Sequence, residues 1–335
     1  MKAFVVAKYG KNGLRPGEVP APIVGPRDVL VQVRAASINP LDMKVRDGEL
    51  KLLLKYKTPF VLGHDLAGVV SRVGAEAGDY KVGDEVYARP RDLRIGAFAE
   101  CIAIDHADIA LKPNSLTMQE SAAVPLVALA AWQALVDLAR VRPGQKVLVH
   151  AGAGGLGSTA IQLAKHLGAY VATTAHGNDE EKVRDLGASE VIDYTRADFA
   201  ELLSGYDVVL DSLGGEILAK SLTVLKPGGL AISVVGPPDA AFAELIGRPL
   251  LKPVMVLMSR KVRAQARKLG VRYSFFFMRA DGEQLKTLAA LYDAGALRPV
   301  LDRTFPFDET LDAMAYVEQG RAKGKIVIVI PLPGI

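Results

Sequence analysis

The glycine-rich turn at residues 152–157 constrains the fold of this chain more than any other stretch. An apolar run, Lys146–Val149, leads into Gly-Ala-Gly-Gly-Leu-Gly, and helical spacing follows from Ser158 to Leu167. A strand, a tight glycine turn and a helix in this order favour binding of a dinucleotide pyrophosphate at the free N–H groups of the helix start. The residues predicted to form this nucleotide site are Gly152, Gly154, Gly155, Leu156 and Gly157.

The chain has a first part rich in β-strand patterns and a second part in which strand and helix patterns alternate. Residues 1 to about 120 contain short strand patterns separated by Gly and Pro, which is typical of a compact β domain. Farther along, strands alternate with helices, and this alternation predicts a parallel, doubly wound sheet, so the predicted fold class is α/β. Strands are predicted in this second part at 146–151, 170–174, 190–193, 206–211 and 230–235.

Two helices are predicted near expected functional residues. The first covers residues 40–47, with Asn39 as its N-cap and Pro40 in its first turn. The second covers the apolar run Ala122–Ala139.

Composition narrows the class of protein. No run of about 18 apolar residues occurs, so we expect no membrane span. The one cysteine, Cys101, excludes an internal disulfide and a cysteine-rich zinc site, and we expect it to be a small buried residue. The residues Met1–Val6 enter a strand pattern at once rather than a secretory leader, which favours a cytoplasmic protein.

The charge is nearly balanced, with 41 basic and 37 acidic residues. This balance argues against strong affinity for nucleic acid. The densest basic patch comprises Arg260–Arg263 with Arg267 and Lys268. Such a patch is a solvated helix face or a surface for an acidic partner.

Several further motifs occur in a fixed order along nearly the whole chain. They are Asn39-Pro40-Leu41-Asp42-Met43-Lys44, Gly63-His64-Asp65-Leu66-Ala67-Gly68, Val82-Gly83-Asp84-Glu85-Val86 and Gly324-Lys325-Ile326-Val327. With the glycine turn, this ordered set resembles the medium-chain dehydrogenase/reductase superfamily in its zinc-free quinone oxidoreductase branch. Within that branch it is similar to enone oxidoreductases (2-alkenal reductases) and to the mitochondrial reticulon-interacting oxidoreductases.

The resemblance implies a two-domain enzyme. A GroES-like catalytic domain would comprise residues 1–121 and 280–335, and a Rossmann NADP-binding domain would comprise 122–279. It also implies a homodimer that uses NADPH to reduce quinones or α,β-unsaturated carbonyls such as enones and 2-alkenals.

Zinc fits the sequence poorly. Zinc-dependent members of the superfamily use a Cys near Ser37–Asn39, the His of a Gly-His-Glu motif, and a Cys or acid near the domain junction. This chain keeps His64 but has Gly-His-Asp, and it has neither thiolate. We therefore expect no metal, and we expect His64 to be a hydrogen-bonded residue of the substrate pocket.

The predicted end of the second Rossmann strand bears on the choice between NADPH and NADH. An acid there would bind the ribose 2′-hydroxyl of NAD, but this chain has Thr174 and His176, which could donate hydrogen bonds to a 2′-phosphate. By resemblance, Tyr194 contacts the same phosphate. The sequence therefore favours NADPH, although Asp179–Glu181 follow closely. Val127, Val235 and Gly236 are expected near the nicotinamide.

Lys44 is the first candidate for catalysis, beside the nicotinamide ribose and the acceptor oxygen. Its cation would stabilise the negative charge that develops on that oxygen; otherwise it is a surface lysine. Asn39 could donate its amide to substrate or cofactor, or simply cap the helix. We expect Asp42 to fix the local turn and Asp65 to orient Lys44 or His64. Phe275, Phe276 and Phe277 are expected to line an apolar acceptor pocket.

A second class of function stays open at this point. The chain could be an NADPH-binding redox sensor, or an RNA-binding protein, with little turnover.

Overall fold

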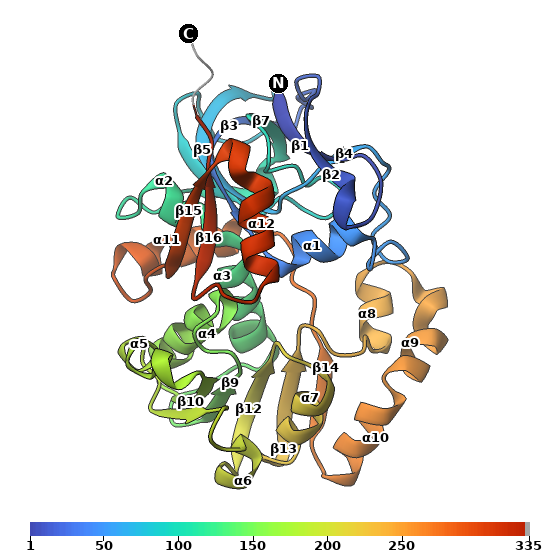
Figure 1. Cartoon of the computed structure of the whole chain (residues 1–335), viewed down its shortest axis with the longest axis vertical. Helices are drawn as coiled ribbons and strands as arrows, with labels where there is room; N and C mark the ends of the chain where they lie inside the picture. The colour runs from blue at the N-terminus through green and yellow to red at the C-terminus, as the bar shows by residue number, and fades with distance from the viewer. Residues whose placement is uncertain (332–335) are drawn as a thin grey trace. The chain divides into compact units, whose positions relative to one another are not determined.

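The computed structural model describes residues 1–331, and the chain forms two compact units (Figure 1). Unit 1 comprises Met1–Leu129 and the segment from Arg279 onward, and unit 2 comprises Ala130–Met278. Residues 122–129, which the sequence analysis assigns to the nucleotide-binding domain, group with unit 1. One reason is a hydrogen bond of 2.8 Å from the backbone N–H of Leu126 to the Asp65 carboxylate.

Unit 1 contains a seven-stranded sheet and a three-stranded sheet. The long strand β3 (Asp28–Ile38) is central in the larger sheet, where it pairs antiparallel with β5, β7 and β16. The strand order is β15-β16-β3-β5-β6-β8, with β7 on β3, and the smaller sheet has the order β2-β1-β4. The other strands are β1 (Lys2–Val6), β2 (Leu14–Glu18), β4 (Phe60–Val61), β5 (Asp65–Val73), β6 (Glu85–Ala88), β7 (Cys101–Asp105), β8 (Ile109–Leu111), β15 (Leu301–Pro306) and β16 (Lys325–Val329).

The side chains of β3 show why this sheet forms. Val29, Val31 and Val33 alternate along the strand and are at most 1% exposed, so one face of the sheet lies against the core. The helices of this unit are α1 (Pro40–Asp47), α2 (Met118–Ala122), α11 (Gly282–Asp293) and α12 (Thr310–Glu318), with 3₁₀ turns η1 (Lys11–Gly13), η2 (His106–Asp108) and η6 (Phe307–Glu309).

Unit 2 is built on a parallel sheet, as predicted, and the sheet has six strands. Their order is β11-β10-β9-β12-β13-β14, so the chain runs from β9 to one edge and then crosses to the other side. This reversal beside β9 is the point at which doubly wound sheets bind nucleotides. The strands are β9 (Lys146–Val149), β10 (Tyr170–Ala175), β11 (Glu190–Asp193), β12 (Tyr206–Asp211), β13 (Leu225–Ser233) and β14 (Arg272–Phe275).

The helices of unit 2 follow the strands in alternation until β13. They are α4 (Gly155–His166), α5 (Glu180–Asp185), α6 (Phe199–Leu202), α7 (Gly215–Ser221), α8 (Ala240–Leu245), α9 (Lys252–Met258) and α10 (Arg260–Lys268), with short turns η4 (Gly177–Asp179) and η5 (Pro249–Leu251).

The segment 122–139 is mostly helical, as predicted, but it is not one continuous α-helix. The segment consists of the end of α2, then α3 (Pro125–Trp132), then a π-helical segment, η3 (Gln133–Leu138). Pro125 has no N–H and its ring would clash with the preceding turn, so it can begin a helix but not continue one. The boundary between the two units lies within α3.

Within residues 1–331, no helix is both long enough and apolar enough to cross a membrane. Cys101 is half-buried at the start of β7 rather than fully buried.

Candidate active site

The glycine turn joins β9 to α4 at the carboxyl edge of the parallel sheet. Gly154 is the N-cap of α4. Because glycine has no side chain, it cannot cap the first N–H groups of the helix. The backbone N–H of Gly152 donates to Thr174 O at 3.0 Å, and the N–H of Gly154 donates to Ala151 O at 3.0 Å. The turn is thus fixed to β10, and the helix start offers free donors to an anion.

Two of these glycines are required by the fold itself. A Cβ added at Gly157 would lie 2.2 Å from Ala151 O, and one at Gly152 would lie 2.2 Å from Thr173 Oγ1. A Cβ at Gly154 would meet only Ala151 O at 3.3 Å. Gly152 and Gly157 therefore allow strand, turn and helix to pack, whereas a Cβ at Gly154 would make a single, less severe contact.

A buried histidine stands at the start of this turn. His150 is 1% exposed, and its Nδ1 and Nε2 lie 3.1 Å from Thr174 Oγ1 and 2.8 Å from Ser221 Oγ. The hydroxyl of Ser221 donates to Ile217 O at 2.7 Å, so it accepts from His150 Nε2–H. His150 Nδ1 then accepts from Thr174, whose Oγ1 accepts the N–H of Ala151 at 3.2 Å. This chain of bonds requires neutral imidazole.

Thr174 is consequently used inside the protein. It is 3% exposed, and its hydroxyl hydrogen is directed at His150. Its predicted hydrogen bond to a cofactor phosphate would require the bond to His150 to break.

His176 and Tyr194 are brought together beyond the ends of β10 and β11. Their rings meet edge to face with centroids 6.1 Å apart, and both are exposed. The Nδ1 atom of His176 accepts from Asn178 N–H at 3.1 Å, which leaves Nε2 of the neutral ring as a free donor. Two of the three residues predicted to contact a 2′-phosphate, His176 and Tyr194, therefore lie side by side with a donor exposed.

Asp193 is a neighbouring acid that the sequence analysis missed. It pairs with Ala175 in the register of β10 and β11, so its carboxylate ends up at the same edge. Hydrogen bonds from the hydroxyl and backbone N–H of Thr195 lower its pKa, and Arg196 lies 3.4 Å away. The end of the second strand, β10, gives no signal for Asp193, because Asp193 lies at the end of the third strand, β11.

The ends of β12 and β13 are joined by a buried acid. Asp211 accepts from Ser233 Oγ at 2.6 Å and from the N–H groups of Leu213 and Gly214, each at 3.0 Å. Ser233 in turn accepts from Gly236 N–H at 2.8 Å. This bond fixes Gly236 at the same carboxyl edge, and Val235 beside it is 37% exposed, so both residues lie in unit 2 where the nucleotide is expected.

The predicted aromatic residues pack on α8. Phe242 contacts Phe275 at 4.8 Å and Phe277 at 5.5 Å between ring centroids, while Phe276 donates its backbone N–H to Ser233 O. All three residues of the Phe275–Phe277 run are half-buried. Part of this cluster supports the fold, and the remaining exposed surface stays a candidate for an apolar acceptor.

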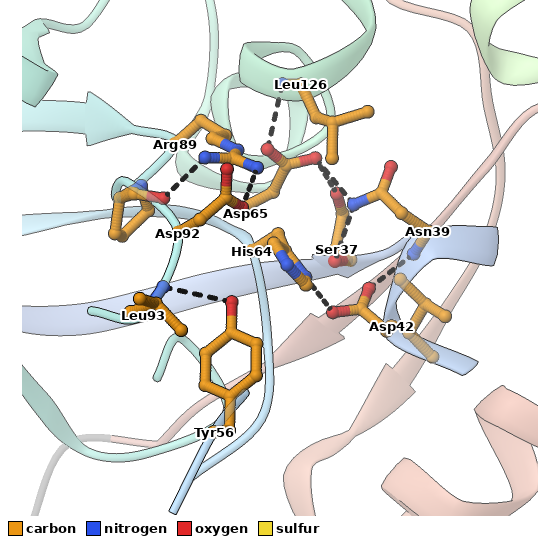
Figure 2. A network of polar contacts seen from close by, with 12 residues as sticks. Ser37, Asn39, Asp42, Tyr56, His64, Asp65, Arg89, Asp92, Leu93 and Leu126 are labelled. Atoms are coloured by element: carbon orange, nitrogen blue, oxygen red, sulfur yellow. Dashed lines mark hydrogen bonds and ion pairs between the residues drawn. The ribbon is translucent and has the colours of Figure 1, made fainter. Parts of the chain in front are cut away.

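Asp65 is the centre of a buried polar network in unit 1 (Figure 2). Its carboxylate accepts from Leu126 N–H at 2.8 Å, from Asn39 Nδ2 at 2.9 Å and from Ser37 Oγ at 3.1 Å. The ammonium of Lys325 lies 3.2 Å from the same carboxylate. Asp65 is fully buried and Lys325 is 5% exposed, so the positive charge compensates the carboxylate directly.

Asp42, rather than Asp65, orients His64. Asp42 Oδ1 lies 2.6 Å from His64 Nδ1, and its Oδ2 accepts from Asn39 N–H at 2.7 Å. Asp42 therefore fixes both the start of α1, as expected, and the imidazole ring. Both residues are fully buried, and His64 Nε2 has no hydrogen-bond partner among residues 1–331. The expectation that Asp65 orients Lys44 or His64 is wrong.

The amide of Asn39 is occupied within this network. Its Nδ2 donates to Asp65, and its Oδ1 accepts from Lys325. Asn39 is 1% exposed, so a direct bond to substrate would require this pattern to rearrange. The observed bonds make Asn39 a link between Lys325 and α1, and the cap of the helix is completed by Asp42.

Lys325 is the second residue that sequence reasoning missed. It belongs to the Gly324-Lys325-Ile326-Val327 motif and lies 260 positions from Asp65 in the sequence. The antiparallel pairing of β16 with β3, in which Ile326 faces Ile38, brings it to Asp65. A lysine beginning an otherwise buried strand was the available signal, because buried lysines need an acidic partner.

Lys44 projects from α1, whose start is held by Asp42. It is half-buried, and no hydrogen bond or ion pair to its ammonium group is found among residues 1–331. Its ammonium is therefore free to interact with a bound ligand. Val127 is 6% exposed near the start of α3, in the part of that helix that belongs to unit 1.

A separate hollow of about 850 Å³ lies elsewhere in unit 1. Its walls come from residues 78–92, 106–111 and 279–286, and none of the predicted site residues lines it. It is therefore not the site that the sequence predicts.

Two family models match the chain. An "Alcohol dehydrogenase GroES-like domain" matches residues 25–131, and a "Zinc-binding dehydrogenase" domain matches residues 186–328. The mouse protein named "NAD(P)H oxidoreductase RTN4IP1, mitochondrial" is 35% identical, and the alignment covers 98% of this chain and 89% of that protein. The chain belongs to the medium-chain dehydrogenase/reductase superfamily.

Two further comparisons fit this membership. The chloroplastic "NADPH-dependent alkenal/one oxidoreductase" of Arabidopsis thaliana is 35% identical over 99% of this chain and 80% of its own length. The solved quinone oxidoreductase of Coxiella burnetii is 30% identical, with a TM-score of 0.86 and coverage of 99% of both chains. This superfamily member is thus an oxidoreductase of the kind that uses a nicotinamide cofactor, and its predicted fold is confirmed.

The side chains around His64 do not fit a zinc ion, although one family model carries zinc in its description. His64 Nδ1 is bonded to Asp42, and Asp65 is saturated by three donors and an ammonium ion. No group of three His, Cys, Asp or Glu side chains in residues 1–331 could hold a metal. Zinc requires about four deprotonated N, O or S ligands, and an ammonium ion at Asp65 opposes a second cation there.

Acid should weaken unit 2 through His150. Burial lowers the His150 pKa to about 4, against 6.5 in an unfolded chain. Below pH 6.5 the unfolded chain binds a proton that the native protein excludes, so stability is complete above 6.5 and falls as pH drops toward 4. The loss attributable to this residue should reach about 3 kcal/mol.

Urea unfolding of wild type and His150→Gln at pH 7 and pH 4.5 measures this contribution. We expect the variant to lose less free energy of unfolding between the two pH values, by about 2 kcal/mol. An equal loss in both proteins would show that His150 titrates normally.

Proposed function

We propose that this superfamily member is a zinc-independent, NADPH-dependent reductase of quinones or α,β-unsaturated carbonyls. The observation that carries the proposal is the ammonium of Lys325 at Asp65. Metal-dependent members are expected to have zinc ligands near Ser37–Asn39 and near Leu126. In this chain, Ser37, Asn39 and the backbone N–H of Leu126 instead donate hydrogen bonds to the Asp65 carboxylate. An enzyme with this arrangement needs an acceptor whose developing charge a side chain can stabilise without a metal.

The acceptor class follows from that requirement. NADPH supplies a hydride when bound. In an enone or a quinone, the carbon that accepts it is conjugated with a carbonyl, so the electron pair moves onto oxygen and a solvent proton completes the product. Lys44, unpaired on a helix fixed by Asp42, is suited to stabilise that oxygen. A simple alcohol would instead have to lose its hydroxyl proton as it is oxidised, and an ammonium group has no lone pair with which to accept that proton.

The choice of NADPH is supported by the edge of unit 2. His176 and Tyr194 lie together with a donor exposed, and no acid terminates β10. Asp193 is the opposing charge, with Arg196 beside it. We propose that NADPH is preferred but that NADH is also used. The homodimer and the cytoplasmic location stay predictions; the mouse relative is named as mitochondrial.

The direct test is NADPH oxidation at 340 nm by protein dialysed against a chelator. The acceptors are a short enone, a long 2-alkenal, 1,4-benzoquinone and 9,10-phenanthrenequinone, with a simple alcohol and NADP⁺ as the reverse reaction. We expect an enone or quinone to be reduced at an unchanged rate after chelation. Turnover restored only by zinc would contradict the proposal, and NADPH binding without turnover of any acceptor would favour a sensor.

Lys44→Met should lower kcat for the enone or quinone by about 100-fold, because one charge-stabilising group at a developing oxyanion contributes about 3 kcal/mol. The Kd for NADPH should change far less. Lys44→Arg should retain more activity than Lys44→Met, and Lys51→Met, at an exposed position after α1, is the matched control. Unchanged kcat in Lys44→Met would remove Lys44 from the reaction.

Asp193→Asn should raise the ratio of kcat/KM with NADPH to that with NADH by roughly tenfold at low salt, because a negative charge near the 2′-phosphate is lost. Asp185→Asn provides the matched control, since Asp185 ends α5 and α5 runs back from the carboxyl edge. The same shift in both variants would assign the effect to net charge rather than to the site.

A further inference from the structure

One segment of unit 2 carries a charge imbalance unlike the rest of the chain. Between Glu244 and Asp281 there are nine Lys and Arg residues and no acidic residue. The remaining positions hold the other 32 basic residues and all 37 acidic ones, so they are net negative. The small positive charge of the protein is therefore due to this one segment.

The helix α10 holds most of that charge without compensation. Val262 and Ala266 face the core of unit 2, and every basic residue of the helix is exposed. No ion pair is found for any of them among residues 1–331, although like charges three and four positions apart repel each other. The residues are Arg260, Lys261, Arg263, Arg267 and Lys268.

The preceding segment exposes large apolar side chains. Leu250 is 92% exposed and Leu257 is 68% exposed, whereas Met255 is the one residue of α9 that is buried. Met258 and Val254 are 55% and 54% exposed. A patch of this kind beside polar surface marks an interaction site.

The exposed apolar residues and two of the basic residues, Lys261 and Lys268, belong to one surface. Ser259 ends α9 and begins α10, and the buried residues Met255, Val262 and Ala266 lie on the inner side of the two helices. Positions 254, 257, 258, 261 and 268 follow the spacing of the outer side. Figure 1 shows α9 and α10 following one another at the side of unit 2 next to β14.

We propose that this surface, formed by η5, α9 and α10, binds an anionic phospholipid bilayer. Leu250, Val254 and Leu257 enter the acyl boundary while Lys261 and Lys268 of α10 contact the headgroups. Apolar and basic side chains side by side on one helical face match such an interface, because apolar burial and attraction to anionic lipids act together. A two-fold dimer through this face would place cations against cations, and an RNA would leave the leucines exposed.

Co-sedimentation of the full-length protein with vesicles tests the proposal. The probes are pure phosphatidylcholine vesicles and vesicles with about 30% phosphatidylglycerol, at about 50 mM and about 500 mM salt. We expect binding to the anionic vesicles at low salt, at least about tenfold above that to neutral vesicles, with most of it lost at high salt. Equal binding to both vesicle types, or none, would overturn the proposal.

Two pairs of variants separate the charge from the apolar contribution. Lys261→Glu/Lys268→Glu and Leu250→Gln/Leu257→Gln should each reduce vesicle binding by at least about tenfold. The matched controls are Lys11→Glu/Lys57→Glu, and Ile23→Gln, at a side chain that is also 92% exposed. Each control should bind vesicles like wild type.

The same variants distinguish other occupants of the surface. Sedimentation velocity that shows Leu250→Gln/Leu257→Gln dissociating a dimer, without wild-type vesicle binding, would assign the surface to a second copy. Wild type that ignores vesicles but binds RNA or an acidic protein would also contradict the proposal. Turnover of a water-soluble acceptor should be unchanged in all variants, so loss of vesicle binding is measured separately from the proposed reaction.

Discussion

A buried carboxylate must be neutralised, and unit 1 is organised around that requirement at Asp65. The ammonium of Lys325 and the donors of Ser37, Asn39 and Leu126 all converge on it. Because these residues come from β3, β16, the start of α1 and the start of α3, one ionic contact connects segments far apart in the chain. Breaking a buried pair by removing one partner leaves an uncompensated charge, which costs several kcal/mol.

The same contact carries the functional argument. The Asn39 side chain accepts a hydrogen bond from Lys325, and its backbone N–H donates to Asp42. Asp42 in turn fixes the start of α1 and bonds to His64. Lys44 is therefore presented by a helix whose start is fixed by buried groups. In unit 2 the corresponding rigidity comes from two buried residues. His150, at the start of the glycine turn, bonds to Thr174 of β10 and to Ser221 of α7, and Asp211 joins the ends of β12 and β13.

Local patterns predicted much of this protein. The glycine turn, the parallel strands and α1 all follow from periodicity and glycine or proline signals within about a dozen residues. The roles that the sequence did not reveal, or that the structure changed, depend on long-range contacts. The partner of Lys325 is set by strand pairing across most of the chain, and Asp193 reaches the nucleotide edge from a neighbouring strand. Thr174 has a suitable hydroxyl, but only the fold shows that His150 uses it.

A double-mutant cycle at Lys325 and Asp65 tests the central claim most directly. The free energy of unfolding is measured for wild type, Lys325→Met, Asp65→Asn and the double variant. We expect Lys325→Met alone to lose about 3–5 kcal/mol and the double variant to recover a large part of that loss, because no buried charge is left unpaired. Additive losses would contradict the account, since Lys325 and Asp65 would then not depend on each other.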